Sequence, residues 1–108
     1  MLFRSSVGNN SGLIINSLVG GGCVIEGGEV KDSVISSNIY IKNKAKIHRS
    51  VLMEGVVVGQ GAQIQNAIID KEVEIPANAK IGFDPELDRQ RFVLTTSGVV
   101  IVAKKTSL

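Results

Sequence analysis

The chain has 108 residues, enough for one domain and too few for two ordinary ones. Its net charge is only +2 and its aromatic residues are three phenylalanines and one tyrosine, which argues against a nucleic-acid binder. The single cysteine, Cys23, excludes an internal disulfide, and no apolar run is long enough to span a membrane. With no secretory signal at the N-terminus, we expect a cytoplasmic protein.

Residues 5–82 repeat with a period of seventeen residues, and the alignment needs no insertion or deletion. Three columns of the alignment contain large aliphatic residues: Val7, Val24, Ile41, Val58 and Ile75; Leu13, Val30, Ile47, Ile64 and Ile81; and Leu18, Ile35, Leu52 and Ile69. A fourth column contains only small residues: Ser11, Gly28, Ala45, Ala62 and Ala79.

Within one period the large aliphatic residues are six, six and five positions apart, as in Ile35, Ile41, Ile47 and Leu52. An amphipathic helix needs spacings of three and four, so the pattern predicts an all-β fold instead. A large residue followed four positions later by a small one suits a chain that turns a corner every six residues. We therefore predict a parallel β-helix of roughly four and a half coils over 5–82, with strands stacked about 4.8 Å apart.

Residues between the inward positions face outward, and two of the three predicted walls have apolar outer faces. One carries Val34, Val51 and Ile68, and the other carries Tyr40 and Val57, with Cys23 in the same column. Monomers rarely expose large contiguous apolar patches, so these stripes predict an interface with a partner. The alternative is that β-branched residues suit strands on any face.

The period stops after Gly82, and residues 83–108 form a predicted cap. Asp84 followed by Pro85 is typical of the start of a short helical turn. Residues 91–95 and 99–103 then read as two β segments around a turn that ends at Gly98. We expect this segment to cover the strand edges of the last coil.

Three stretches carry a more specific resemblance: "NSLVGGGCVIEGGEVKDSVI" at 16–35, "IIDKEVEIPANAKIGFDPELDRQRF" at 68–92 and "TTSGVVIVAK" at 95–104. Together they resemble the C-terminal domain of the glucose-1-phosphate adenylyltransferases, also called ADP-glucose pyrophosphorylases. The resemblance spans nearly the whole chain and implies that the β-helix is left-handed, against the usual right-handed crossover rule.

In that family an upstream catalytic domain uses ATP, glucose 1-phosphate and magnesium to make ADP-glucose and pyrophosphate for glycogen or starch synthesis. No glycine-rich phosphate loop between a strand and a helix is found in this sequence. The resemblance therefore implies a fragment without the catalytic domain, inactive by itself, with no catalytic residue, metal or cofactor of its own. Its implied role is allosteric regulation and assembly of a homo- or hetero-tetramer.

The resemblance also implies a site for a phosphorylated effector. Lys71, in the Ile-Asp-Lys motif, and Lys104, six residues after Gly98, match family positions that contact effector phosphates. Arg91 and Lys105 are further candidates because they lie nearby in the sequence. Several convergent cations suit a phosphate-rich anion. The alternative for Lys71 is a solvated corner lysine paired with Asp70 or Glu72.

Two other functions remain open. His48 is a candidate general base of a hexapeptide-repeat, acyl-CoA-dependent sugar acyltransferase, although an exposed histidine without a catalytic role is the favoured interpretation. The outward apolar columns also suit a purely structural trimerisation β-helix. We interpret Cys23 as an outward surface or interface residue, because no base near it in the sequence would activate the thiol.

Overall fold

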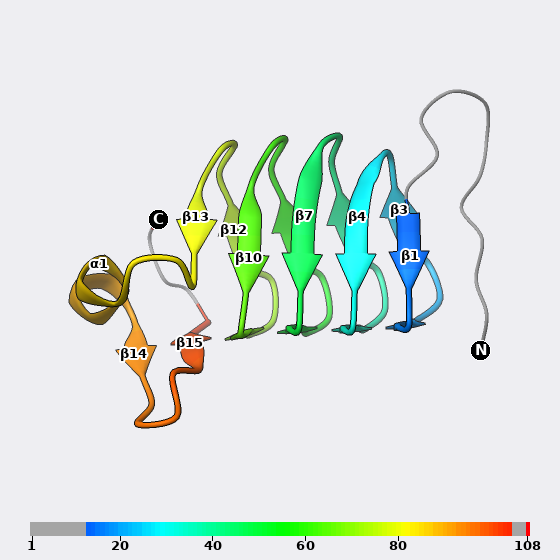
Figure 1. Cartoon of the computed structure of the whole chain (residues 1–108). Coiled ribbons are helices and arrows are strands. Elements are labelled where there is room, and N and C mark those ends of the chain that lie inside the picture. The colour runs from blue at the N-terminus through cyan, green and yellow to red at the C-terminus, as the bar shows by residue number, and fades with distance from the viewer. Residues whose placement is uncertain (1–12, 105–107) are drawn as a thin grey trace.

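The computed structural model describes residues 13–104 and 108, and these form a parallel β-helix with a short cap (Figure 1). The first wall contains β1 (Leu13–Ile15), β4 (Gly28–Lys31), β7 (Ala45–His48), β10 (Gln63–Gln65) and β13 (Lys80–Ile81). The second contains β2 (Leu18–Val19), β5 (Val34–Ile35), β8 (Val51–Leu52), β11 (Ala67–Ile69), β15 (Val100–Val102) and β14 (Val93–Leu94). The third contains β3 (Val24–Ile25), β6 (Tyr40–Ile41), β9 (Val57–Val58) and β12 (Glu74–Ile75). The predicted all-β solenoid is confirmed.

Most corners between the walls contain a residue in the left-handed backbone region. Between the first and second walls these are Asn16, Asp32, Arg49 and Asn66, with φ between 48° and 51°. Their side chains link successive coils, since Asn16 Nδ2 donates to Asp32 Oδ1 at 2.6 Å and Arg49 Nε donates to Asn66 Oδ1 at 2.9 Å. Asn and Asp tolerate this conformation because their short polar side chains bond locally.

Large aliphatic side chains fill the interior of the coils. The predicted inward residues from the second coil onward are at most 2% exposed: Ile35, Ile41, Ile47, Leu52, Val58, Ile64, Ile69, Ile75 and Ile81. Ala45 and Ala62 are fully buried in the predicted small-residue column. Burying one such large side chain contributes about 1.5 to 3 kcal/mol relative to leaving it exposed, so the stack is the main source of stability.

The first coil departs from the predicted register. Val24 pairs with Tyr40 and Leu18 with Val34, an offset of sixteen residues, whereas the later coils pair at seventeen. Leu18 and Val24, predicted to face inward, are 55% and 54% exposed. The inward residues are instead their neighbours Val19 and Ile25, which are 5% and 6% exposed. The prediction of an unbroken seventeen-residue period is therefore wrong for the first coil.

The first coil is one residue shorter than the later coils, and the shortening lies in the corner between the third and first walls. In the later coils this corner contains a left-handed residue, which is Lys44, Gly61 or Asn78. Among the described residues, the corner between Ile25 and Val30 has none. Gly28 follows it, and a side chain there would lie 2.3 Å from the Ala45 carbonyl oxygen, so the shortened corner packs closely against the next coil.

Serine hydroxyl groups satisfy the backbone where the second wall begins. The N–H groups of Ser33, Ser50 and Ala67 donate to the hydroxyl of the serine one coil earlier at 3.0, 3.1 and 3.3 Å. Ser33 and Ser50 are buried, so these bonds meet the requirement that buried N–H groups find acceptors. The first serine of this ladder is Ser17, sixteen residues before Ser33, in agreement with the shorter first coil.

The cap consists of a helix and an antiparallel strand pair. Helix α1 (Pro85–Arg91) follows its N-cap Asp84, whose Oδ1 accepts from the N–H groups of Glu86 and Leu87 at 3.1 and 3.3 Å. β14 then pairs antiparallel with β15 around a turn at Gly98. The helical turn predicted after Asp84 is thus a seven-residue helix, and both predicted β segments contain a strand.

The three walls end in different ways beyond the last coil (Figure 1). On the first wall, side chains of α1 replace a strand: Asp88 Oδ2 accepts from Gly82 N–H at 3.0 Å, and Arg91 Nη2 donates to the Lys80 carbonyl at 3.0 Å. On the second wall, β15 pairs with β11 as a further strand. On the third wall, β12 is the terminal strand of its sheet.

Candidate functional site

The structure brings two of the predicted effector ligands to one corner. Lys71 follows β11 and Lys104 follows β15, and these strands pair in parallel with Ile69 opposite Val102. Asp70 N–H extends the pairing by donating to the Val102 carbonyl at 3.0 Å. Each lysine lies two residues beyond the Ile69–Val102 pair, so both occupy the same end of adjacent strands. Both side chains are exposed.

The backbone of this corner leaves the two ammonium groups available. Lys71 N–H donates to Asp70 Oδ1 at 2.7 Å, so that carboxylate is held by its own turn. Glu72 has φ of 59°, and its N–H donates to the Glu54 carbonyl at 2.9 Å. Within residues 13–104 and 108, neither Lys71 nor Lys104 takes part in an ion pair. The corner therefore presents two flexible positive charges to solvent.

The other two predicted effector ligands lie elsewhere or outside the described residues. Arg91 is held at the end of the first wall, where its guanidinium donates to Lys80, lies 3.6 Å from Asp88 Oδ1 and stacks on the Phe92 ring at 4.8 Å. These contacts assign Arg91 a structural role in the cap. Lys105 lies outside the described residues.

The predicted interface residues of the second wall form one continuous apolar row. Val34 pairs with Val51 and Val51 with Ile68, and all three face outward. The row extends beyond the prediction in both directions. It begins at Leu18, 55% exposed, and continues after Ile68 through Ile101 to Val93, 60% exposed. We call these six residues the second-wall stripe.

The sequence pattern does not identify three residues of the second-wall stripe, for two different reasons. Leu18 was missed because the uniform period placed it inward. Ile101 and Val93 lie in the cap, which has no repeat to align with the coils. Only the pairing of β15 with β11 places them beside Ile68.

The third-wall residues Tyr40 and Val57 pair side by side on the outer face, both partly exposed. The Tyr40 hydroxyl donates to the Glu26 carboxylate, and Lys42 Nζ lies 5.7 Å from the ring centroid. The hydrogen bond to Glu26 raises the pKa of Tyr40 above that of an ordinary tyrosine, because it stabilises the protonated hydroxyl. The tyrosine is therefore fixed in place by Glu26 of the preceding coil and Lys42 of its own coil, and the row ends at the charged Glu74.

Cys23 and His48 have structural surroundings. Cys23 was predicted to face outward, but the sixteen-residue first coil turns it toward the interior, where it packs against the core and donates to the Ser36 carbonyl at 2.9 Å. His48 Nε2 contacts Glu29 Oε2 on the outer face of the first wall, with both side chains about a third exposed. His48 lines neither the groove along β12 nor the one beside α1.

Across residues 13–104 and 108, no three acidic, histidine or cysteine side chains gather as a metal site. No helix in the same part of the chain is long and apolar enough to cross a membrane.

Comparison with known proteins agrees with the coil geometry. Residues 2–102 match the family described as "GlmU-like, C-terminal hexapeptide". The chain belongs to this family.

Several proteins with similar sequences are named glucose-1-phosphate adenylyltransferase. The chain is 46% identical to one from Arthrobacter sp. (strain FB24) over 103 residues, which cover 94% of the chain and 22% of that protein. It is 40% identical to one from Anaeromyxobacter sp. (strain Fw109-5) over 103 residues, covering 95% and 25%. It is 44% identical to glucose-1-phosphate adenylyltransferase 2 of Vibrio cholerae serotype O1 over 98 residues, covering 91% and 24%. The chain thus spans about a quarter of the length of these relatives, and the resemblance noted from its motifs is confirmed.

Proposed function

We propose that this chain is the β-helix part of a glucose-1-phosphate adenylyltransferase that makes ADP-glucose and pyrophosphate from ATP and glucose 1-phosphate. The observation that carries the proposal is its similarity, over more than nine-tenths of its length, to proteins with that name. Adenylyl transfer and the magnesium it uses are assigned to a catalytic domain outside this chain. The β-helix itself contributes regulation and assembly in a cytoplasmic tetramer.

The regulatory role rests on the corner formed by Lys71 and Lys104. Two lysines on adjacent strand ends supply convergent positive charge, and flexible ammonium groups adapt to a phosphate group of either ester or diphosphate type. The corner lies on the outside of the coil, so an anion binds there without disturbing the core. A phosphorylated metabolite is the ligand class that fits this charge and exposure.

The effector assignment is tested with Lys71→Ala and Lys104→Ala in the full-length protein. Each loss of a charged hydrogen bond to phosphate is expected to raise the effector concentration for half-maximal response roughly tenfold or more. Turnover without effector stays unchanged, because neither lysine touches the core. Lys46→Ala, which removes an exposed lysine from the first wall, is the matched control. Unaltered response curves in both variants would remove the assignment.

The assembly role rests on the second-wall stripe. Exposed apolar rows of this length are uncommon on monomers and are typical of subunit or domain contacts. Val51 lies near the middle of the stripe, half-buried between Val34 and Ile68. A carboxylate at this position would have to be desolvated in any interface that covers it.

Val51→Asp is therefore expected to raise the dissociation constant of subunit association at least tenfold in the full-length protein. Sedimentation velocity should then show a shift toward smaller species. Gln63→Asp is the control, because Gln63 has the equivalent outward position in the middle of the polar first wall. If Val51→Asp and Gln63→Asp both keep the parent sedimentation coefficient, the stripe is not a subunit interface.

A further inference from the structure

The third wall ends in a strand edge with an unusual composition. In the preceding coils, the N–H groups of Tyr40 and Val57 donate to the carbonyls of the next coil at 3.1 and 3.0 Å. Glu74 occupies the same position in β12, but β12 is the terminal strand of its sheet. The next donor position along this edge is Pro76, which has no N–H group. Because Pro76 offers no N–H group and Glu74 carries a charge, this edge is poorly suited to pairing with a further strand.

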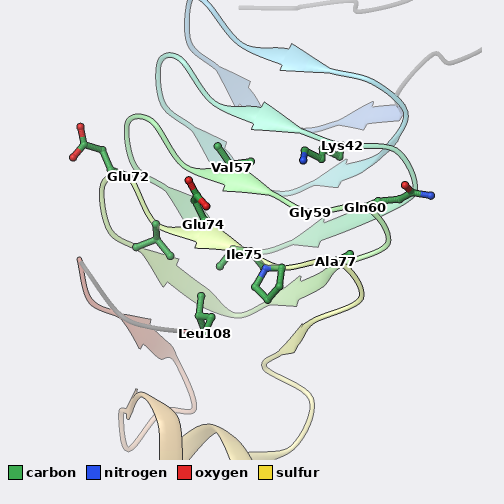
Figure 2. Close-up of a pocket in the computed structure, with 11 residues that line it drawn as sticks. Lys42, Val57, Gly59, Gln60, Glu72, Glu74, Ile75, Ala77 and Leu108 are labelled. Atoms are coloured by element: carbon green, nitrogen blue, oxygen red, sulfur yellow. The ribbon is translucent and has the colours of Figure 1, made fainter.

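An open groove of about 760 Å³ runs along this edge. Its apolar lining includes Val57, Ile75, Pro76 and Leu108, and Glu72 and Glu74 line it as well. Figure 2 shows Leu108 next to β12, with its side chain directed toward the strand. Leu108 is 38% exposed, so most of its surface is covered although it is distant in sequence from the groove.

The strand register independently places Leu108 beside Ile75. β15 pairs with β11 at a constant offset of 33 residues, from Ala67 opposite Val100 to Ile69 opposite Val102. Adding the same offset to Ile75 gives residue 108. Ile75 is an inward residue, 2% exposed, on the last strand of the third wall. Leu108 therefore has the position that the inward residue of one more coil would have.

We propose that Leu108 closes the third wall, docking on the edge of β12 with its side chain stacked on Ile75. This completes the end of the core, which α1 covers on the first wall and β15 covers on the second. Leu108 thus covers part of the β12 edge and forms one side of the groove that remains open beside it. With Pro76 in the edge, the contact depends on the apolar side chain more than on backbone pairing.

The proposal is tested by amide hydrogen exchange of the whole chain with Leu108→Asp. Exchange at Glu74 and Ile75 should become about tenfold faster, the change expected from losing the burial of most of one leucine side chain. Exchange at Lys80 and Ile81, whose edge α1 covers, should stay the same. Leu108→Met should keep the parent rates, and Leu13→Asp, at a leucine 52% exposed on the first coil, should leave Glu74 and Ile75 unaffected.

Unchanged exchange at Glu74 and Ile75 in Leu108→Asp would overturn the proposal, because Leu108 would then not cover the edge. Equal acceleration at Lys80 and Ile81 would mean that Leu108→Asp destabilises the whole fold, and the milder variant Leu108→Ala then decides. Acceleration of β12 alone in Leu108→Ala supports the proposal, and equal acceleration of both strands overturns it. Protection of Glu74 that rises with protein concentration and persists in Leu108→Asp would assign the groove to a second copy of the chain.

Discussion

Gly82→Ala is expected to destabilise the folded chain by about 2 to 5 kcal/mol, the sum of backbone strain and steric overlap. Gly82 has φ of 92°, which side chains disfavour. An added Cβ would also lie 1.9 Å from the Gln65 carbonyl oxygen, which belongs to the backbone of the preceding coil and has little room to move. Urea denaturation of the variant and the parent chain measures this loss.

Gly82 is also the link between the last coil and the cap. Its N–H donates to Asp88, which is 2% exposed, and its carbonyl accepts from Gln65 Nε2 at 2.9 Å. Any shift of the backbone that relieves the overlap would lengthen these bonds and leave a buried carboxylate without its donor. The overlap at Gly82 therefore also destabilises the docking of α1, because the hydrogen bond between Gly82 and Asp88 holds this helix against the last coil.

Gly98→Ala is the matched control for this prediction. Gly98 has φ of 90°, nearly the same as Gly82, but nothing lies within 4 Å of the position that a Cβ would occupy. The control therefore carries the backbone strain alone, about 1 to 2 kcal/mol. Equal losses for the two variants would show that the contact with Gln65 has no energetic effect.

Val19→Asp is expected to cost roughly 3 to 5 kcal/mol, the range for an uncompensated buried charge. Val19 is 5% exposed and packs in the core of the first coil. Leu18→Asp, one residue earlier and 55% exposed, should change the free energy of unfolding by no more than about 0.5 kcal/mol. Chemical denaturation of the two variants, analysed by its midpoint and slope, shows which of the two residues faces inward.

A uniform seventeen-residue period makes the opposite prediction, because it aligns Leu18 with the inward residues Ile35 and Leu52. A larger loss for Leu18→Asp than for Val19→Asp would therefore restore that period and contradict the sixteen-residue first coil. Val24→Asp and Ile25→Asp provide an independent second pair on the third wall, with the same expected order.

The first coil shows why its register was not predictable from the sequence. Each of its strands contains adjacent aliphatic residues, such as Leu18 with Val19 and Val24 with Ile25. Shifting a strand by one residue exchanges its inner and outer faces, yet with such pairs both registers place an aliphatic side chain inside. The one-residue shortening of the first coil lies at a corner, where a residue can be lost without changing the pattern of inward side chains. Cys23 was assigned to the outer face for the same reason.

The candidate effector corner was only partly predictable. Lys71 lies within the repeat, so its corner position follows from the period. Lys104 lies in the cap, and its place beside Lys71 depends on β15 adding a strand to the second wall after a helix and a turn have intervened. Proximity in the sequence makes Arg91 a further candidate, but the contacts of its guanidinium hold it at the first wall.

By itself, the sequence determined the β-helix and its core from the second coil to Ile81, because a period of large inward and small corner residues has one simple folded solution. It also determined the family, through motifs that span the coils and the cap. The tertiary structure alone decided the register of the first coil, the extension of the second-wall stripe to Ile101 and Val93, and the different endings of the three walls. These features depend on contacts between segments that share no repeat, so their positions are set by strand pairing and packing in three dimensions.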